Sequence, residues 1–191
     1  MKIISLYGNE NSLIKKSAKG DPQAQRLLYE RFSPKMLSVC RQYVKDLHFA
    51  EDVMVNGFIK VFKNLGSFQH KGSFEGWIRT IMVRESISFL RKRQFVVYDD
   101  EIFDAQHEQS IYNEGLLDVE YVQQLIDALP EGYKTVFLLY AVEGYNHQEI
   151  AKMLEITEGT SKSQLFKARK MLQENLSLKG MSPKSNSASK K

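Results

Sequence analysis

Cysteine is almost absent from this sequence of 191 residues, in which Cys40 is the only one. A single thiol excludes an intrachain disulfide framework and a zinc site built from several cysteines. Cys40 lies in an apolar helical pattern at residues 36–40, so we expect a buried structural thiol. Such low cysteine usage is typical of a reducing compartment, and we expect the protein to be cytoplasmic.

Long apolar runs and catalytic motifs are also missing. No stretch approaches the ~18 apolar residues of a membrane-spanning helix, and residues 1–8 lack the apolar length and cleavage pattern of a secretory signal. We therefore expect no export. The sequence has no glycine-rich phosphate loop, no His/Cys metal spacing and no nucleophile motif. We expect no enzyme activity, no cofactor and no small-molecule substrate.

Basic residues are absent between Arg93 and Lys134. The net charge of +4 therefore hides three blocks: residues 1–93 carry +9, residues 94–133 carry −10, and residues 134–191 carry +5. Basic blocks of this kind attract nucleic acid, and an acidic block is repelled by it. Two basic blocks therefore flank an acidic one.

The apolar residues recur at spacings of three and four, which predicts an all-α protein. We expect two small helical domains, an N-terminal helical bundle and a C-terminal helix-turn-helix, joined by an acidic linker. The predicted domains are residues 1–93 and 116–176, the linker is residues 94–115, and residues 177–191 form a basic tail expected to be disordered.

Capping residues place the helices of the N-terminal domain. Asp21 followed by Pro22 begins one helix, a second is expected over residues 50–65, and Ser73 caps a third that runs to Arg93. The predicted core positions of these helices are Leu27, Leu28, Phe32, Met36, Leu37, Val53, Phe58, Val61, Phe62, Phe74, Trp77, Ile78 and Ile81.

In the C-terminal domain, helices are expected over residues 116–128 and 133–142, followed by two helices joined by a tight turn. Asn146 and Glu149 have the spacing of a capping box, and Thr157 caps the last helix, which we expect to reach Leu172. His147, in the first turn, is expected to be a surface or capping residue. Helical spacing places Ser161, Leu165, Ala168 and Leu172 on one side of the last helix and Lys162, Ser163, Phe166, Lys167 and Lys170 on the other.

The second side of that last helix combines cations and hydrogen-bonding groups. In a helix-turn-helix such a face enters the major groove, although many lysine-rich faces are merely solvated. In the N-terminal domain, Thr80, Arg84 and Arg91 share a helical stripe suited to phosphates and base edges. Phe68, in a loop, is a candidate for stacking on an unpaired base, whereas Phe74 and Trp77 are expected to be mainly structural.

With these motifs in view, the chain resembles bacterial RNA polymerase sigma factors of the extracytoplasmic-function (ECF) subfamily, over about residues 20–93 and 116–174. These proteins retain only the second and fourth conserved sigma regions. The matching segments, in chain order, are residues 50–53, 58–62, 74–81, 129–137, 144–151 and 158–163.

The resemblance implies a subunit that docks on core RNA polymerase, directs it to a class of promoters and helps to open the duplex. It also implies an anti-sigma factor as a partner. The residues carried over for polymerase contact are Asp52, Phe58 and Lys60. Those for the minus-ten element are the loop 67–73, including Phe68 and Ser73, together with Thr80, Arg84 and Arg91. Those for the minus-thirty-five element are Lys162, Ser163, Phe166, Lys167 and Lys170.

Three departures from the family pattern stand out. The family commonly has glutamine and an acidic residue where this chain has Val55 and Asn56, often asparagine at Arg84, and a β-branched aliphatic residue and an arginine at Ser161 and Gln164. Two other functions also fit the sequence. One is a helix-turn-helix regulator whose N-terminal half senses or dimerises, and the other is a partner-binding module with incidental DNA affinity.

Overall fold

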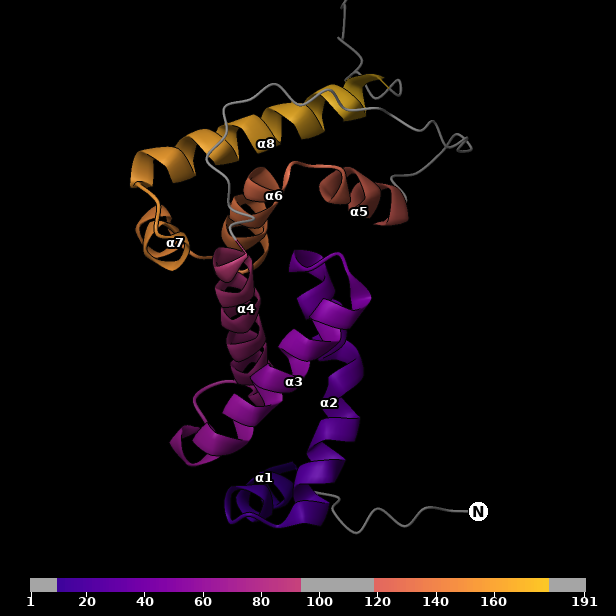
Figure 1. Cartoon of the computed structure of the whole chain (residues 1–191), viewed down its shortest axis with the longest axis vertical. Coiled ribbons are helices and arrows are strands. Elements are labelled where there is room, and N and C mark those ends of the chain that lie inside the picture. Colours follow the sequence, from indigo (N-terminus) through magenta and orange to yellow (C-terminus); the bar gives the residue numbers. More distant parts are fainter. Residues whose placement is uncertain (1–9, 94–118, 179–191) are drawn as a thin grey trace, which may run out of the picture. The chain divides into compact units, whose positions relative to one another are not determined.

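The computed structural model describes residues 10–93 and 119–178, and in these ranges it is helical without any strand (Figure 1). The predicted all-α fold is confirmed. The chain divides into two compact units, residues 1–94 and 95–191, and each is described by itself. The predicted linker at residues 94–115 lies outside the described residues. None of the described helices is long and apolar enough to cross a bilayer.

The described part of the N-terminal unit contains four α-helices: α1 (Glu10–Ala18), α2 (Pro22–Tyr43), α3 (Leu47–Asn64) and α4 (Phe74–Lys92). Helices α2, α3 and α4 pack against one another, and α1 packs on α2. A short 3-10 turn, η1 (Leu65–Ser67), follows α3 and lies beside α1. Helix α1 was not predicted from the sequence.

Side-chain caps set the starts of these helices. Asp21 Oδ1 accepts hydrogen bonds from the backbone N–H groups of Gln23 and Ala24, at 2.9 and 3.2 Å, as predicted. Ser73 Oγ accepts from the N–H of Gly76 at 3.0 Å, as predicted. The predicted start of the second helix at residue 50 is wrong. Asp46 caps α3 by accepting from an N–H in its first turn, so the helix begins three residues earlier.

The core of this unit is apolar and follows the predicted periodicity. Leu28, Met36 and Ile78 are fully buried where α2 and α4 meet the rest of the unit. Leu27 was predicted to join them, but 38% of its surface is exposed. It is one residue, or 100°, away from Leu28 on the helix, and this rotation carries it out of the buried stripe.

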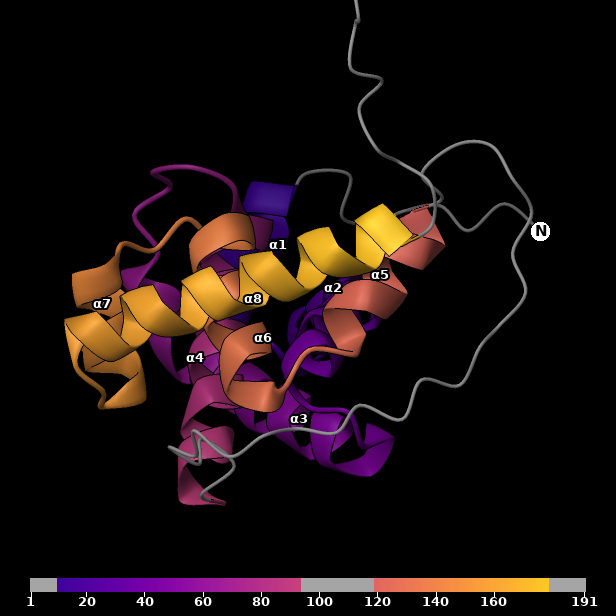
Figure 2. The same cartoon turned by 90° about the horizontal axis from the view of Figure 1, so that it is seen from above.

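The C-terminal unit contains α5 (Val119–Asp127), α6 (Glu131–Phe137), α7 (His147–Leu154) and α8 (Glu158–Leu178), with a π-helical turn, η2 (Leu138–Val142), after α6. Helix α8 extends across the unit and packs on α5, α6 and α7 (Figure 2). Helix α6 begins at Glu131 and not at Tyr133, and α8 ends beyond the predicted Leu172.

The predicted helix-turn-helix is present as α7 and α8. Asn146 Oδ1 accepts from the N–H of Glu149 at 2.9 Å, and Glu149 Oε2 accepts from the N–H of Asn146 at 2.8 Å, which completes the capping box. Thr157 Oγ1 accepts from the N–H of Thr160 at 3.0 Å and caps α8. Glu155, at φ 58°, closes α7 in the left-handed conformation and turns the chain towards α8.

Candidate nucleic-acid and polymerase interfaces

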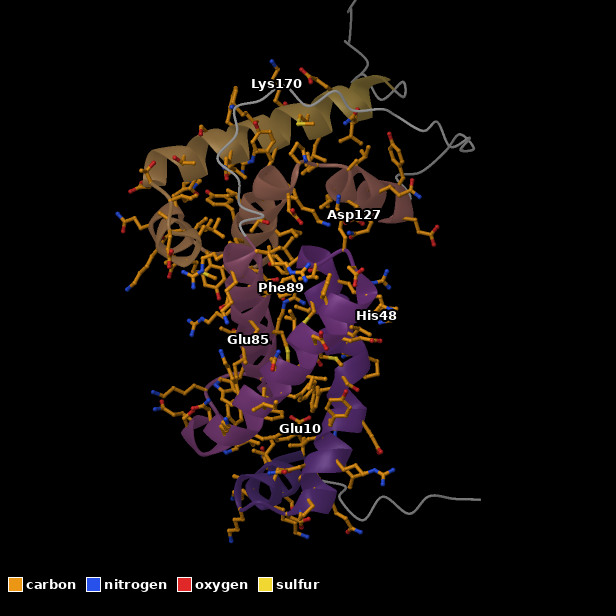
Figure 3. All side chains as sticks on the ribbon, viewed as in Figure 1. Glu10, His48, Glu85, Phe89, Asp127 and Lys170 are labelled. Atoms are coloured by element: carbon orange, nitrogen blue, oxygen red, sulfur yellow. The ribbon has the colours of Figure 1, made fainter. Side chains whose placement is uncertain are left out.

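The outer side of α8 carries the residues predicted for the minus-thirty-five element. Ser161, Leu165 and Ala168 are buried, so the helix is fixed with its opposite side towards solvent. We call that side the α8 face. Figure 3 shows Lys170 extending outward from it. The α8 face consists of Lys162, Ser163, Phe166, Lys167 and Lys170, of which only Lys167 is partly buried.

Phe166 is the most exposed large apolar side chain among the described residues, with 69% of its surface accessible. Exposing an aromatic ring to water is unfavourable, because a buried phenylalanine gains about 2 kcal/mol or more from leaving water. A base pair offers such a ring an apolar partner in the thymine methyl group, which lies in the major groove. Phe166 therefore suits a surface that becomes covered in a complex.

The cations of the α8 face are held by local interactions. Lys162 Nζ lies 2.7 Å from Glu158 Oε1, one turn earlier, and this ammonium lowers the pKa of the Glu158 carboxyl. Lys167 Nζ lies 5.7 Å from the centre of the Tyr133 ring. Ser163 Oγ donates to the carbonyl of Thr160 at 3.0 Å. Exposed pairs of this kind are worth about 1 kcal/mol or less, so they can yield to a phosphate.

The loop before α4 is closed over an aromatic cluster. Phe68 is 9% exposed, and its ring centre lies 5.2 Å from that of Phe74 and 5.5 Å from that of Trp77. Stacking of Phe68 on a base stays a prediction, and it would require the loop to open. Ser73 is exposed, but its hydroxyl is engaged as the α4 cap.

The stripe predicted on α4 is only partly accessible. Arg84 is exposed, whereas Thr80 and Arg91 are partly buried and Ile87, between the two arginines, is buried. Thr80 Oγ1 donates to the carbonyl of Gly76 at 3.0 Å. Arg84 is therefore the residue of this stripe most available to DNA.

The three residues predicted to contact polymerase lie on α3 but do not share one face. Asp52 and Lys60 are exposed, whereas Phe58 is 2% exposed and packs edge-on against Tyr29, with ring centres 4.8 Å apart. Phe58 therefore belongs to the core, and a direct polymerase contact by its ring stays a prediction. Lys60 forms an ion pair with Glu85 of α4.

Two apolar residues on the outer side of α3 were not among the residues predicted to contact polymerase. Val55 and Ile59 are each 45% exposed, and the helical repeat aligns them with Asp52. We call Asp52, Val55 and Ile59 the α3 face. Their spacing from Asp52, i+3 and i+7, is visible in the sequence, but Val55 was noted only as a departure from the family pattern and Ile59 only as part of a matching segment.

Two family matches cover most of the described chain. Residues 28–96 match the family described as Sigma-70 region 2, and residues 120–172 match Sigma-70, region 4. The first match contains the α3 face and the α4 stripe, and the second contains the helix-turn-helix. The chain belongs to the sigma-70 family, as an ECF-type sigma factor. The function predicted from its motifs, promoter recognition by a sigma subunit of RNA polymerase, is confirmed.

The alignments with individual relatives cover nearly the whole length of each relative. The RNA polymerase sigma-H factor of Pseudomonas aeruginosa is 27% identical over 187 residues, covering 87% of this chain and 93% of the relative. The ECF RNA polymerase sigma-E factor of Escherichia coli K12 is 29% identical over 173 residues, covering 84% and 90%. A solved complex of the Bartonella quintana sigma factor RpoE with the anti-sigma factor NepR aligns with a TM-score of 0.47 and 23% identity, covering 80% of this chain and 96% of that one.

The two C-terminal residues that depart from the family pattern, Ser161 and Gln164, both lie in packed surroundings. Ser161 is fully buried, and its hydroxyl lies 2.9 Å from Nδ1 of His147, so a polar contact replaces the usual aliphatic side chain. Gln164 is 8% exposed and lies against Gly132 of α6. In this sigma factor, position 164 is therefore a packing position and not part of the α8 face.

Proposed function

We propose that this sigma factor uses the α8 face to read the minus-thirty-five element and uses α4 with its preceding loop to bind and open the minus-ten element. The observation that carries the proposal is the exposure of Phe166 among cations on the second helix of a capped helix-turn-helix. A solvated lysine face alone would not need an exposed aromatic ring. The side chains assigned to each promoter element are those named from the sequence. On α4, Arg84 is the side chain expected to make the main contact.

We further propose that α3 docks on core RNA polymerase through Asp52, Val55 and Ile59, with Lys60 at the margin. The two exposed aliphatic side chains support this assignment, because interface centres are apolar and their rims are charged. The protein would then act in the cytoplasm, as an initiation factor without catalytic activity of its own.

An anti-sigma factor is the third partner that we propose, because restraint by such proteins is usual in this family. The solved Bartonella quintana relative was crystallised with an anti-sigma factor. A protein that covers the α3 face or the α8 face would block polymerase or promoter. Affinity purification of the tagged chain from its own host, before and after envelope stress, tests for such a partner.

Reconstituted transcription tests the main proposal. Purified protein is added to core polymerase and a library of genomic promoter fragments, and transcripts are mapped. We expect starts at promoters that share a minus-thirty-five and a minus-ten sequence, and their loss with the α8-face variant Phe166→Ala. If no transcript starts although the protein binds DNA, it is a regulator that works without polymerase. If it neither binds DNA nor starts transcripts, it is a partner-binding module.

A further inference from the structure

The two helices of the helix-turn-helix meet at a polar contact outside the α8 face. Nδ1 of His147, the first residue of α7, lies 2.9 Å from Oγ of the fully buried Ser161. The ring of Tyr140 stacks on the imidazole at a centroid distance of 4.8 Å and an interplanar angle of 26°. His147 itself is partly exposed. The imidazole is therefore held by a hydroxyl at one nitrogen and by an aromatic ring on one face.

This arrangement leaves the second ring nitrogen as the functional one. When Ser161 donates to Nδ1, the neutral imidazole carries its proton on Nε2 and presents a donor there. When the imidazole is protonated, the hydroxyl rotates to accept from Nδ1–H, and Nε2–H is again a donor. A valine or isoleucine at position 161 could do neither. In the other neutral tautomer Nδ1–H donates to Ser161 and Nε2 is an acceptor, so only protonation makes Nε2–H a donor in every case.

The position of His147 in the motif suggests what this donor meets. In a helix-turn-helix the second helix enters the major groove while the first crosses the sugar-phosphate backbone. His147 stands at the start of the first helix, directly after its Asn146 cap. Phosphate oxygens accept more than half of all protein–DNA hydrogen bonds. A donor on the first turn of α7 is placed for such an oxygen.

The elements around the imidazole, α7, α8 and η2, each bring charged groups or contacts with charged groups. On α8, Glu158 interacts electrostatically with His147 but is paired with Lys162. On α7, Glu149 is engaged in the capping box. Arg169 of α8 makes a cation–π contact with Tyr140 of η2, with its guanidinium carbon 5.4 Å from the ring centre. Glu158 and Glu149 thus have other partners, and a phosphate would be a new anionic partner for the ring.

We propose that His147 is a phosphate-contacting residue of the minus-thirty-five unit and that Ser161 positions it, so that DNA binding strengthens as the imidazole gains a proton. This inference rests on the proposed DNA-binding role of the C-terminal unit. A phosphate beside the ring favours the charged form, so the complex takes up a proton, and affinity rises as the pH falls through the range in which histidine titrates. The charged ring displaces one more counterion from the DNA than the neutral ring does.

Salt-dependent DNA binding at two pH values tests this inference. Fluorescence anisotropy of the full chain is measured on a mixed-sequence duplex of about 30 base pairs, at about pH 5.5 and 7.5. We expect binding about three- to tenfold tighter at the lower pH, because charge-assisted hydrogen bonds are roughly twice as strong as neutral ones. The slope of log K against log salt should steepen by about 0.9.

Four variants identify the residues responsible. His147→Gln should lose much of this pH effect, and Ser161→Ala should reduce it, since the ring is no longer held. His48→Gln is the control, because His48 is exposed on α3 of the other unit and its loss should leave the effect unchanged. Ser161→Val restores the packing usual in the family and should behave like Ser161→Ala. Thermal melting confirms that each variant is folded at both pH values.

Two results would overturn the inference. If His147→Gln retains the full pH effect, the imidazole makes no phosphate contact. If Ser161→Ala and Ser161→Val both match the wild type, the serine does not position the ring. Since this binding assay contains no polymerase, either result with intact promoter-specific transcription leaves the proposed function standing. Absent transcription with an intact pH effect would overturn the proposed function alone.

Discussion

Two adjacent residues of α8 should separate the proposed DNA recognition from folding. Phe166 is exposed, whereas Leu165 is buried against the rest of the C-terminal unit. Phe166→Ala removes a mostly exposed side chain, so the free energy of unfolding should change by less than about 0.5 kcal/mol. Leu165→Ala removes a core side chain and should cost about 2–5 kcal/mol.

For promoter affinity we expect the larger loss in Phe166→Ala, measured under conditions in which both variants are folded. Phe166→Ala should weaken binding to a promoter duplex about tenfold or more, while folded Leu165→Ala keeps its affinity. Urea titrations and anisotropy with the promoter found by transcription mapping measure the two quantities. Unchanged promoter affinity in Phe166→Ala would remove the ring from the recognition surface.

Cys40 makes the stability of the N-terminal unit depend on alkaline pH. The pKa of this thiol is raised to about 11, mainly because burial disfavours the thiolate; a hydrogen bond with Ser86 acts in the opposite direction, and the charge of Glu85 adds to the rise. The folded state therefore keeps its proton where the unfolded state has lost it. This contribution is fully present below pH 8.5, near the unfolded pKa of a cysteine, and is lost towards pH 11.

The loss amounts to about 2–3 kcal/mol over the full range. Other groups titrate there too, so the comparison needs the variant Cys40→Ala. Between about pH 8 and 10.5, the free energy of unfolding of the wild type should fall more steeply than that of Cys40→Ala. Urea unfolding followed by circular dichroism measures both curves. Parallel curves would mean that the folded thiol titrates normally.

At the scale of helices, the ion pair between Lys60 and Glu85 joins α3, which we propose binds polymerase, to α4, which we propose reads the promoter. Lys60→Glu places two carboxylates together and should cost about 1 kcal/mol of stability. The double variant Lys60→Glu/Glu85→Lys reverses the pair and should regain most of that loss. Polymerase association should stay weakened in both variants, because the proposed contact has lost the cation at position 60.

A second pair provides the control. Lys35 of α2 and Glu75 of α4 form an exposed ion pair, with Nζ and Oε2 2.9 Å apart, that does not involve α3. Lys35→Glu/Glu75→Lys should leave polymerase association unchanged. The binding is measured by native gel shift with core enzyme. If reversal of the Lys60 pair restores polymerase binding together with stability, Lys60 acts through helix packing and not by direct contact.

Helix starts and buried helix sides were predictable where they depend on residues that are close in the sequence. The caps at Asp21, Ser73 and Asn146 and the buried side of α8 depend on residues within one or two turns, and all are confirmed. Which side of an apolar helix is covered depends on residues far away in sequence. That is why Leu27 and the exposed pair on α3 were misassigned or missed, and why the burial of Phe68 by Phe74 and Trp77 could not be foreseen.

The contact between His147 and Ser161 was unpredictable for the same reason. The two residues are fourteen positions apart, and neither type signals the other. The sequence did show that Ser161 departs from the family pattern, but a departure gives no partner. Only the crossing of α7 and α8 brings the imidazole and the hydroxyl within hydrogen-bond distance.

At the scale of the whole chain, charge is divided into blocks of +9, −10 and +5. All eight acidic residues from Asp99 to Glu120 lie in the segment between the two basic blocks. We expect their negative charge to compete with DNA for basic surfaces, which would weaken DNA binding by the free protein. In a polymerase channel built for nucleic acid, the same charge would be attracted to the channel walls.

Replacing these eight residues by asparagine and glutamine raises the net charge from +4 to +12. Free protein should then bind duplex DNA more tightly at low salt, with the gain vanishing at about 1 M salt, where the Debye length is near 3 Å. Holoenzyme should still bind its promoter but start fewer transcripts per bound complex. Anisotropy and single-round transcription on one promoter measure the two effects. Normal initiation with weakened promoter binding would instead place the acidic block at the DNA surface.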